Sequence, residues 1–173
     1  MSNKDKSKCR IIGIDPGLDT TGYAVVDFAS QADIIEAGTI QTAVSGNLQD
    51  RIAQIYDDLT EILIELTPDI AAVEKLYSHY RHPRTAILMG HARGAILLAC
   101  AEREIPVWDL PATMVKRSLT GNGRASKQQV QRAVASICNL PEPPSPPDVA
   151  DALAIALCTA KRLENPLKGV KSR

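Results

Sequence analysis

The sequence predicts an α/β fold built on a mixed five-stranded sheet flanked by helices. Three extended segments with short links come first, which favours antiparallel pairing. Helical segments and short apolar segments then alternate, a pattern typical of parallel strands joined by helices. The chain has 173 residues and an apolar content of 45%, which suits one domain with a sizeable and mostly aliphatic core.

The antiparallel half of the sheet is predicted at residues 10–15, 21–28 and 33–41. Three of the six residues at 10–15 are isoleucines, which give this segment its strand character. Pro16 and Gly17 then break the strand and turn the chain back into a hairpin. The first strand therefore ends at a carboxylate, Asp15.

Helices and strands alternate through the rest of the chain. Helices are predicted at about 48–66, 84–104, 112–119, 126–138 and 147–163, and strands at 69–76 and 105–110. Asn47 is the expected N-cap of the first helix, and Ser126 and Gln129 form a capping box for the fourth. Gly90 and Gly94 each weaken the second helix by about 1 kcal/mol relative to alanine. Close packing against the sheet or against a partner subunit would offset that loss.

Composition predicts a cytoplasmic protein with no membrane association. No apolar run approaches the roughly 18–20 residues that a membrane span needs, and the amino terminus lacks the apolar segment of a signal peptide. The four cysteines are scattered, which indicates reduced thiols and no zinc site. Residues 1–9 and 165–173 are expected to be flexible, which leaves 10–164 as one domain.

The net charge is zero, but the charges are segregated. Two stretches, 75–101 and 110–141, contain no acidic residue. Their basic residues are Lys75, Arg81, Arg84, Arg93, Lys116, Arg117, Arg124, Lys127 and Arg132. Two basic blocks in one small domain can form a surface that binds phosphate groups. Ordinary solvated helix faces are the alternative interpretation.

Four carboxylates are candidates for a common site. Asp15 ends a buried strand and Glu74 lies in the second half of another. Asp148 and Asp151 lie on one face of the last helix, in its first turn. If the first and fourth strands pair in parallel, all four can meet at one edge of the sheet. Asp15 can instead bond turn N–H groups, and Asp148 can complement the helix dipole.

Such a cluster would require cations, because four carboxylates close together repel one another. Oxygen ligands of this kind suit magnesium or manganese. Two such ions can activate water and stabilise the leaving oxygen in phosphodiester hydrolysis, without a protein nucleophile. The basic blocks would then hold the phosphates of the substrate.

Five segments, in this order, closely resemble the RuvC family of bacterial Holliday-junction resolvases: IIGIDPGLDTTGYAVV, AVEKLY, PRTAILMGHARG, VKRSLTGNGRASKQQVQ and PPDVADALAIAL. The resemblance covers about residues 10–160. It implies a ribonuclease H-like fold and a homodimer that nicks four-way DNA junctions symmetrically. It also implies magnesium dependence and branch-migration motor proteins as partners.

The resemblance also implies roles for individual residues. Asp15, Glu74, Asp148 and Asp151 match the family's acidic tetrad and would hold two Mg²⁺ ions per active site, with Mn²⁺ able to substitute. The aromatic that inserts at the junction centre in relatives matches Tyr77, which suits stacking on unpaired bases. Further DNA contacts are expected from Lys116, Lys127, Arg124 and Arg84.

The sequence departs from the family in the long helix, where relatives often carry a lysine and a glutamine at the positions of Leu88 and His91. A phosphate contact from position 88 is therefore not expected. A solvent-exposed Leu88 would suit the dimer interface, with Gly90 and Gly94. The histidines have no zinc spacing and are expected at the surface or near DNA; they are His79, His82 and His91.

Three other functions are compatible with parts of the pattern. Actin-like and sugar-kinase phosphotransferases share the sheet topology, but they need two such domains around a nucleotide, and 173 residues are too few. A related nuclease acting on RNA is the second alternative. A non-catalytic junction-binding module is the third, and the complete acidic tetrad disfavours it.

Overall fold

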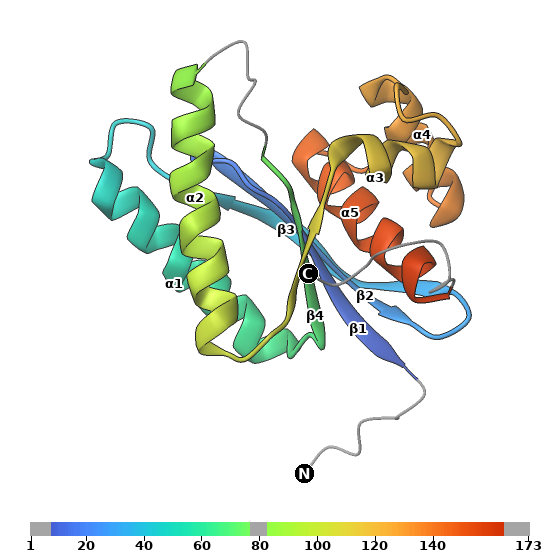
Figure 1. Cartoon of the computed structure of the whole chain (residues 1–173), viewed down its shortest axis with the longest axis horizontal. Coiled ribbons are helices and arrows are strands. Elements are labelled where there is room, and N and C mark those ends of the chain that lie inside the picture. The colour runs from blue at the N-terminus through green and yellow to red at the C-terminus, as the bar shows by residue number, and fades with distance from the viewer. Residues whose placement is uncertain (1–7, 77–82, 165–173) are drawn as a thin grey trace.

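The computed structural model describes residues 8–76 and 83–164. Its centre is a five-stranded sheet in the order β3-β2-β1-β4-β5, with helices on both faces (Figure 1). The strands are β1 (Cys9–Asp15), β2 (Thr20–Phe28), β3 (Ala32–Gln41), β4 (Ile70–Glu74) and β5 (Val107–Leu110). Strands β1, β2 and β3 pair antiparallel, whereas β4 is parallel to both β1 and β5. The predicted mixed sheet is confirmed.

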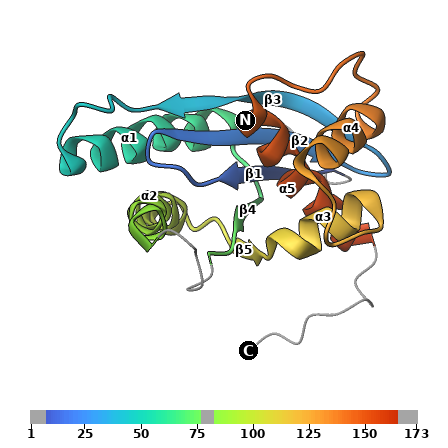
Figure 2. The same ribbon diagram turned by 90° about the horizontal axis from the view of Figure 1, so that it is seen from above.

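The helices form two layers, one on each side of the sheet (Figure 2). One layer is α1 (Leu48–Leu66) and α2 (Pro83–Glu102), and the other is α3 (Ala112–Thr120), α4 (Lys127–Ile137) and α5 (Pro147–Glu164). All predicted elements are present, with bounds that differ by no more than two residues. Strand β1 begins at Cys9, one residue inside the amino-terminal segment that was expected to be flexible.

Strands β1, β2 and β4 are buried on both faces, so their side chains alternate between two cores. Ile11, Ala24 and Ala72 pack with α3, α4 and α5, whereas their neighbours Ile12 and Val73 pack with α1 and α2. This period of two is the geometry of an extended strand. It assigns the side chain at the end of each strand to a definite face.

Helix α5 lies directly on the sheet because glycines leave room for its backbone. A Cβ atom at Gly13 would lie 2.3 Å from the carbonyl oxygen of Ala152, and one at Gly22 would lie 2.2 Å from that of Asp148. Neither position can accept a larger side chain unless the helix moves. The many alanines of this helix give it the matching flat surface, and residues 149–160 are all buried except Asp151.

The two predicted caps have different outcomes. The Ser126 hydroxyl accepts the Gln129 N–H at 3.3 Å, and the Gln129 side chain accepts the Ser126 N–H at 2.8 Å, which confirms the capping box of α4. Asn47 occupies the N-cap position of α1, but its side chain does not cap the helix. Its amide donates instead to the Asp50 carboxylate at 3.4 Å, so the predicted N-cap position is confirmed without a side-chain cap hydrogen bond.

Helix α2 is apolar on its inner and its outer side. Leu88, which would suit the dimer interface if it were solvent-exposed, packs partly buried against the core beneath α2. The exposed apolar side chains of this helix are Ile87 (61% exposed) and Leu98 (52%). A Cβ atom at Gly90 or Gly94 would meet nothing within 4 Å, so these glycines do not serve close packing on the sheet. Within the described ranges, no helix has both the length and the apolar character to cross a membrane.

Candidate active site

The parallel pairing of β1 with β4 brings two of the predicted carboxylates together. The register pairs Ile14 with Val73, so Asp15 and Glu74 follow at the carboxyl ends of neighbouring strands. Strand alternation directs both side chains to the face that α5 covers, because Ile11 and Ala72 lie on that face. The sequence predicted that Asp15 and Glu74 lie close together only if the first and fourth strands pair in parallel, and the structure shows that pairing.

Helix α5 brings the other two carboxylates to the same place. Gly22 pairs with Asp15 across β1 and β2, and the first turn of α5 lies on that glycine. Asp148 therefore lies above the end of β1. Asp151 is three residues further along the helix and shares its face. Electrostatic coupling joins Asp15 to each of the other three carboxylates.

The four carboxylates make ionisation of the most enclosed one unfavourable. Burial raises the pKa of Asp15 to about 7, and the negative charges of Glu74, Asp151 and Asp148 add to the shift. Burial also raises the pKa of Glu74, followed by the charge of Asp151. A carboxylate that is both buried and surrounded by like charges is stabilised by a nearby cation.

Two lysines supply part of the missing positive charge. The Lys127 ammonium lies 2.7 Å from a carboxylate oxygen of Asp151. This hydrogen bond, supported by the charges of Asp151, Asp148 and Asp15, raises the pKa of Lys127, so the side chain stays charged at neutral pH. Lys127 and Lys116 both oppose the rise in the pKa of Glu74. The lysines predicted to contact DNA therefore belong to the electrostatic surroundings of the carboxylates.

Divalent magnesium fits the donor chemistry of this site, which offers carboxylate oxygens. The carboxylates are not already gathered around one point: in the part of the chain that the structure describes, no three His, Cys, Asp or Glu side chains are placed to hold an ion together. Side-chain rotation and displacement of Lys127 from Asp151 would be needed to form such a set.

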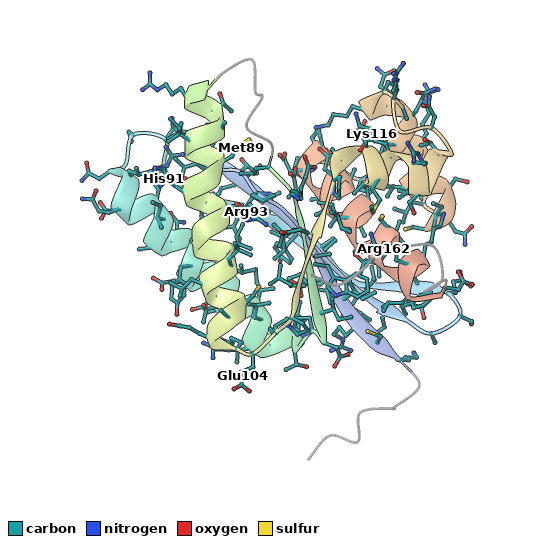
Figure 3. The ribbon with its side chains drawn as sticks, in the orientation of Figure 1. Met89, His91, Arg93, Glu104, Lys116 and Arg162 are labelled. Atoms are coloured by element: carbon teal, nitrogen blue, oxygen red, sulfur yellow. The ribbon has the colours of Figure 1, made fainter. Side chains whose placement is uncertain are left out.

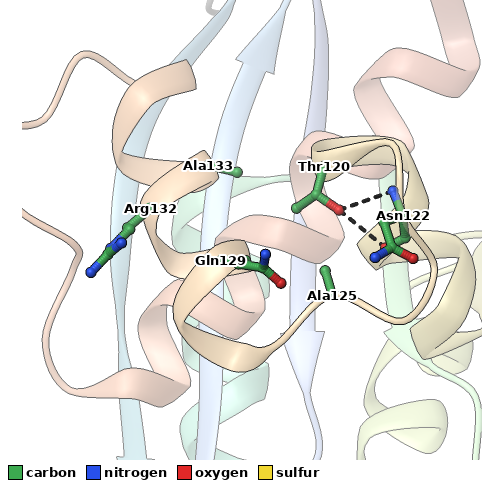
Figure 4. Close-up of a pocket in the computed structure, with 6 residues that line it drawn as sticks. All are labelled: Thr120, Asn122, Ala125, Gln129, Arg132 and Ala133. Atoms are coloured by element: carbon green, nitrogen blue, oxygen red, sulfur yellow. Dashed lines mark hydrogen bonds between the residues drawn. The ribbon is translucent and has the colours of Figure 1, made fainter.

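The basic loop between α3 and α4 contains local hydrogen bonds to its backbone. The Thr120 hydroxyl accepts the Asn122 N–H at 3.2 Å, and the Asn122 side chain accepts the Arg124 N–H at 2.9 Å. Beside this loop lies an open pocket of about 290 Å³, lined also by Gln129 and Arg132 (Figure 4). None of the four carboxylates lines it. The pocket, whose lining includes one basic residue, is therefore separate from the carboxylate cluster.

The other predicted contacts lie further from the carboxylates. Arg124 and Arg84 are exposed, Arg124 in the α3–α4 loop and Arg84 in the first turn of α2. His91 is exposed on α2 (Figure 3). Tyr77, with His79 and His82, falls outside the described residues, so its expected role stays a prediction.

Sequence reasoning missed one contact beside Glu74. The guanidinium of Arg93, on α2, donates to the backbone carbonyl of Glu74 at 3.3 Å and pairs with Asp109 on β5. Arg93 was counted only as one member of a basic block. No sequence pattern links positions 74, 93 and 109, because their proximity depends on the packing of α2 across the ends of β4 and β5.

A five-stranded sheet in this order, with carboxylates at the carboxyl ends of two adjacent parallel strands and a helix lying across them, is an architecture of the ribonuclease H-like class. Comparison with known proteins agrees. The family model described as crossover junction endodeoxyribonuclease RuvC matches residues 11–159. The RuvC protein of Rhodopirellula baltica is 49% identical over 158 residues, which cover 91% of this chain and 89% of the relative. The chain belongs to the RuvC family.

Solved structures show the same architecture. RuvC from Thermus thermophilus has a TM-score of 0.83 and 33% identity, and the matched region covers 90% of this chain and 95% of that one. A second structure, of T. thermophilus RuvC in complex with a Holliday junction substrate, has a TM-score of 0.81 and 31% identity over the same shares. The ribonuclease H-like fold implied by the sequence motifs is confirmed.

Proposed function

We propose that this chain is a structure-selective endonuclease that resolves Holliday junctions by paired, symmetric nicks, in DNA recombination and repair. The observation that carries the proposal is the cluster of Asp15, Glu74, Asp148 and Asp151 in a member of the RuvC family. The similar T. thermophilus protein has been solved with a Holliday junction substrate. The expected surroundings are the bacterial cytoplasm, where branch-migration motor proteins would act on the same junction.

Asp15, Glu74, Asp148 and Asp151 would hold two Mg²⁺ ions, and Mn²⁺ would be an acceptable substitute. Bound ions of this kind supply an activated water and neutralise charge on the scissile phosphate. The elevated pKa of Asp15 supports the proposal, because a buried carboxylate beside three others is stabilised when cations enter. The products would carry 5′-phosphate and 3′-hydroxyl ends.

The lysines would connect the site to the DNA backbone. Lys127 is 57% exposed at its side chain even while it bonds Asp151, so it can also reach a phosphate outside the cluster. Lys116 lies close enough to lower the pKa of Glu74. Arg124 and Arg84 would extend the contact along the arms, and Tyr77 would stack at the junction centre. Selectivity would then come mainly from junction shape and charge, with a modest base preference near Tyr77.

The active form would be a homodimer, because a symmetric junction presents two equivalent strands for cleavage. The outer side of α2 suits the dimer interface: Ile87 and Leu98 are exposed there, and Gly90 and Gly94 allow a second backbone to approach. A helix face that presents exposed apolar side chains commonly marks a surface that another protein covers.

A nicking assay on a synthetic four-way junction tests the proposal. Wild type and Glu74→Gln are incubated with magnesium or with EDTA, beside a linear duplex of the same sequence and a structured RNA. Paired, magnesium-dependent nicks confined to the junction and lost in Glu74→Gln are the expected result. Tight junction binding without nicks would indicate a binding module, and preferential cleavage of RNA would indicate a different nuclease.

A further inference from the structure

Arg93 makes an unusual set of contacts for a residue on the outer layer of helices. It extends from the third turn of α2 to the carboxyl ends of two strands (Figure 3). Its Nε donates to the backbone carbonyl of Glu74 at 3.3 Å, and its guanidinium pairs with the Asp109 carboxylate on β5. The Arg93 side chain is 17% exposed, whereas that of Asp109 is 50% exposed.

The Glu74 carbonyl lacks the partner that a continued sheet would give it. Ala71 donates its N–H to the carbonyl of Pro106, just before β5, and Lys75 donates to that of Leu110, at the end of β5. Successive residues of a parallel strand direct their backbone N–H and C=O groups alternately to the two neighbouring strands. Because Lys75 bonds toward β5, the backbone groups of Glu74 point toward β1. One step beyond the last register pair, Glu74 lies opposite Asp15. In a parallel pair the residue after Asp15 should donate its N–H to the Glu74 carbonyl, and that residue is Pro16. Proline has no N–H, and Arg93 supplies the donor.

Arg93 approaches from the face of the sheet opposite to the carboxylate cluster. Its helix packs with the Val73 side of β4, and Asp109 is the register partner of Val73 on β5. The Glu74 side chain points to the other face, toward Asp151 and Lys127. Arg93 therefore contacts the backbone that carries the carboxylate and does not lie among the reacting groups.

We propose that Arg93 is a positioning residue for Glu74, held in place by Asp109. It fixes the end of β4 where the sheet itself cannot, and so sets the direction in which the Glu74 carboxylate points. The proposal rests on the proposed catalytic role of Glu74. Because α2 also carries the exposed apolar side, Arg93 joins the candidate dimer helix to the candidate catalytic strand.

The test compares Arg93→Gln, Arg93→Lys and Asp109→Asn with wild type. Arg103→Gln is the matched control, because Arg103 is exposed just after the end of α2. Measured for each are thermal unfolding, junction affinity in EDTA, Mn²⁺ binding by calorimetry without DNA, and the single-turnover nicking rate across a magnesium titration. Mn²⁺ binding and the magnesium dependence of nicking distinguish an effect on the position of the Glu74 carboxylate from an effect on the stability of the fold.

We expect Arg93→Gln to reduce the nicking rate at saturating magnesium by about tenfold or more, because a shift of about 1 Å can reduce a rate by about a hundredfold. Mn²⁺ affinity should fall and the half-saturating magnesium concentration should rise, with junction affinity unchanged. Arg93→Lys should recover part of the rate, because an ammonium can donate to the same carbonyl. Asp109→Asn should be intermediate.

A wild-type rate and metal dependence in Arg93→Gln would overturn the proposal. A loss of junction affinity as large as the loss of rate would also overturn it, because Arg93 would then be a DNA contact. If Arg93→Gln does not fold, Arg93→Lys and Asp109→Asn replace it in the test, and a wild-type rate and metal dependence in both would overturn the proposal. Full activity in Glu74→Gln would instead refute the proposed site, whereas an inactive Glu74→Gln with a normal Arg93→Gln refutes the positioning role alone.

Discussion

Gly22→Ala should reduce junction cleavage by about a hundredfold while the protein stays folded. A methyl group at this position would lie 2.2 Å from the carbonyl oxygen of Asp148 and 2.7 Å from its carbonyl carbon. An ordinary contact between carbon and oxygen is about 3.3 Å or more, so the first turn of α5 must retreat by about 1 Å. A displacement of that size at a catalytic group can reduce a rate by about a hundredfold.

The assay is single-turnover nicking of a four-way junction, with circular dichroism to follow unfolding. Overpacking should also destabilise the protein by about 1–3 kcal/mol, so nicking is measured well below the unfolding temperature. Gly38→Ala is the matched control, because the three atoms nearest to a methyl group there all belong to the Tyr23 side chain, at 2.9–3.0 Å, and none to a helix backbone. A folded Gly22→Ala protein that cuts within threefold of wild type would refute the claim that Gly22 sets the position of Asp148.

Three further predictions follow from the charges and surfaces. Lys127→Ala removes the 2.7 Å pair with Asp151, and the salt dependence of junction binding should weaken by about 0.9 in its log–log slope; an unchanged slope in a binding titration would place Lys127 away from the phosphates. In EDTA, wild-type stability should fall as the pH rises from about 4 to about 7, because folding raises the pKa of Asp15 from 3.8 to about 7 and the native state therefore holds the proton more tightly. Urea unfolding of Asp15→Asn should show a weaker decline over that window, and an identical decline would remove Asp15 as its source. Ile87→Asp with Leu98→Asp should give a monomer by light scattering and lose paired nicking; a dimer would exclude this side of α2 as the interface.

The elements could be predicted because their signals are local. Isoleucines in β1, the spacing of apolar residues in α1, and the capping box at Ser126 act over a few residues, and the structure reproduces them. Asn47 also occupies its predicted N-cap position, although its amide bonds the Asp50 carboxylate and its side chain does not cap the helix. The position of Leu88 could not be decided from the sequence, because α2 carries apolar residues on both its inner and its outer side and periodicity does not distinguish the two.

The candidate site was only partly predictable, because its contacts cross the sheet. The sequence shows that Asp148 and Asp151 share a helix face, but only the strand order brings them to Asp15 and Glu74. The bond between Lys127 and Asp151 requires α4 to pack beside α5, and no spacing indicates it.

The two faces of the sheet contribute different things to the same site. On one face, glycines in β1 and β2 remove the side chains that would hold α5 away, so the helix backbone reaches the strands and its carboxylates meet those of the sheet. On the other face, larger aliphatic side chains keep α1 and α2 at an ordinary distance, and a long arginine spans it. Close packing therefore sets the distance between the carboxylates, whereas Arg93 acts at the one carbonyl that Pro16 leaves without a ladder partner. Because these two controls lie on opposite faces, substitutions at Gly22 and Arg93 should reduce the cleavage rate independently, and the free-energy changes of the double variant should be close to additive.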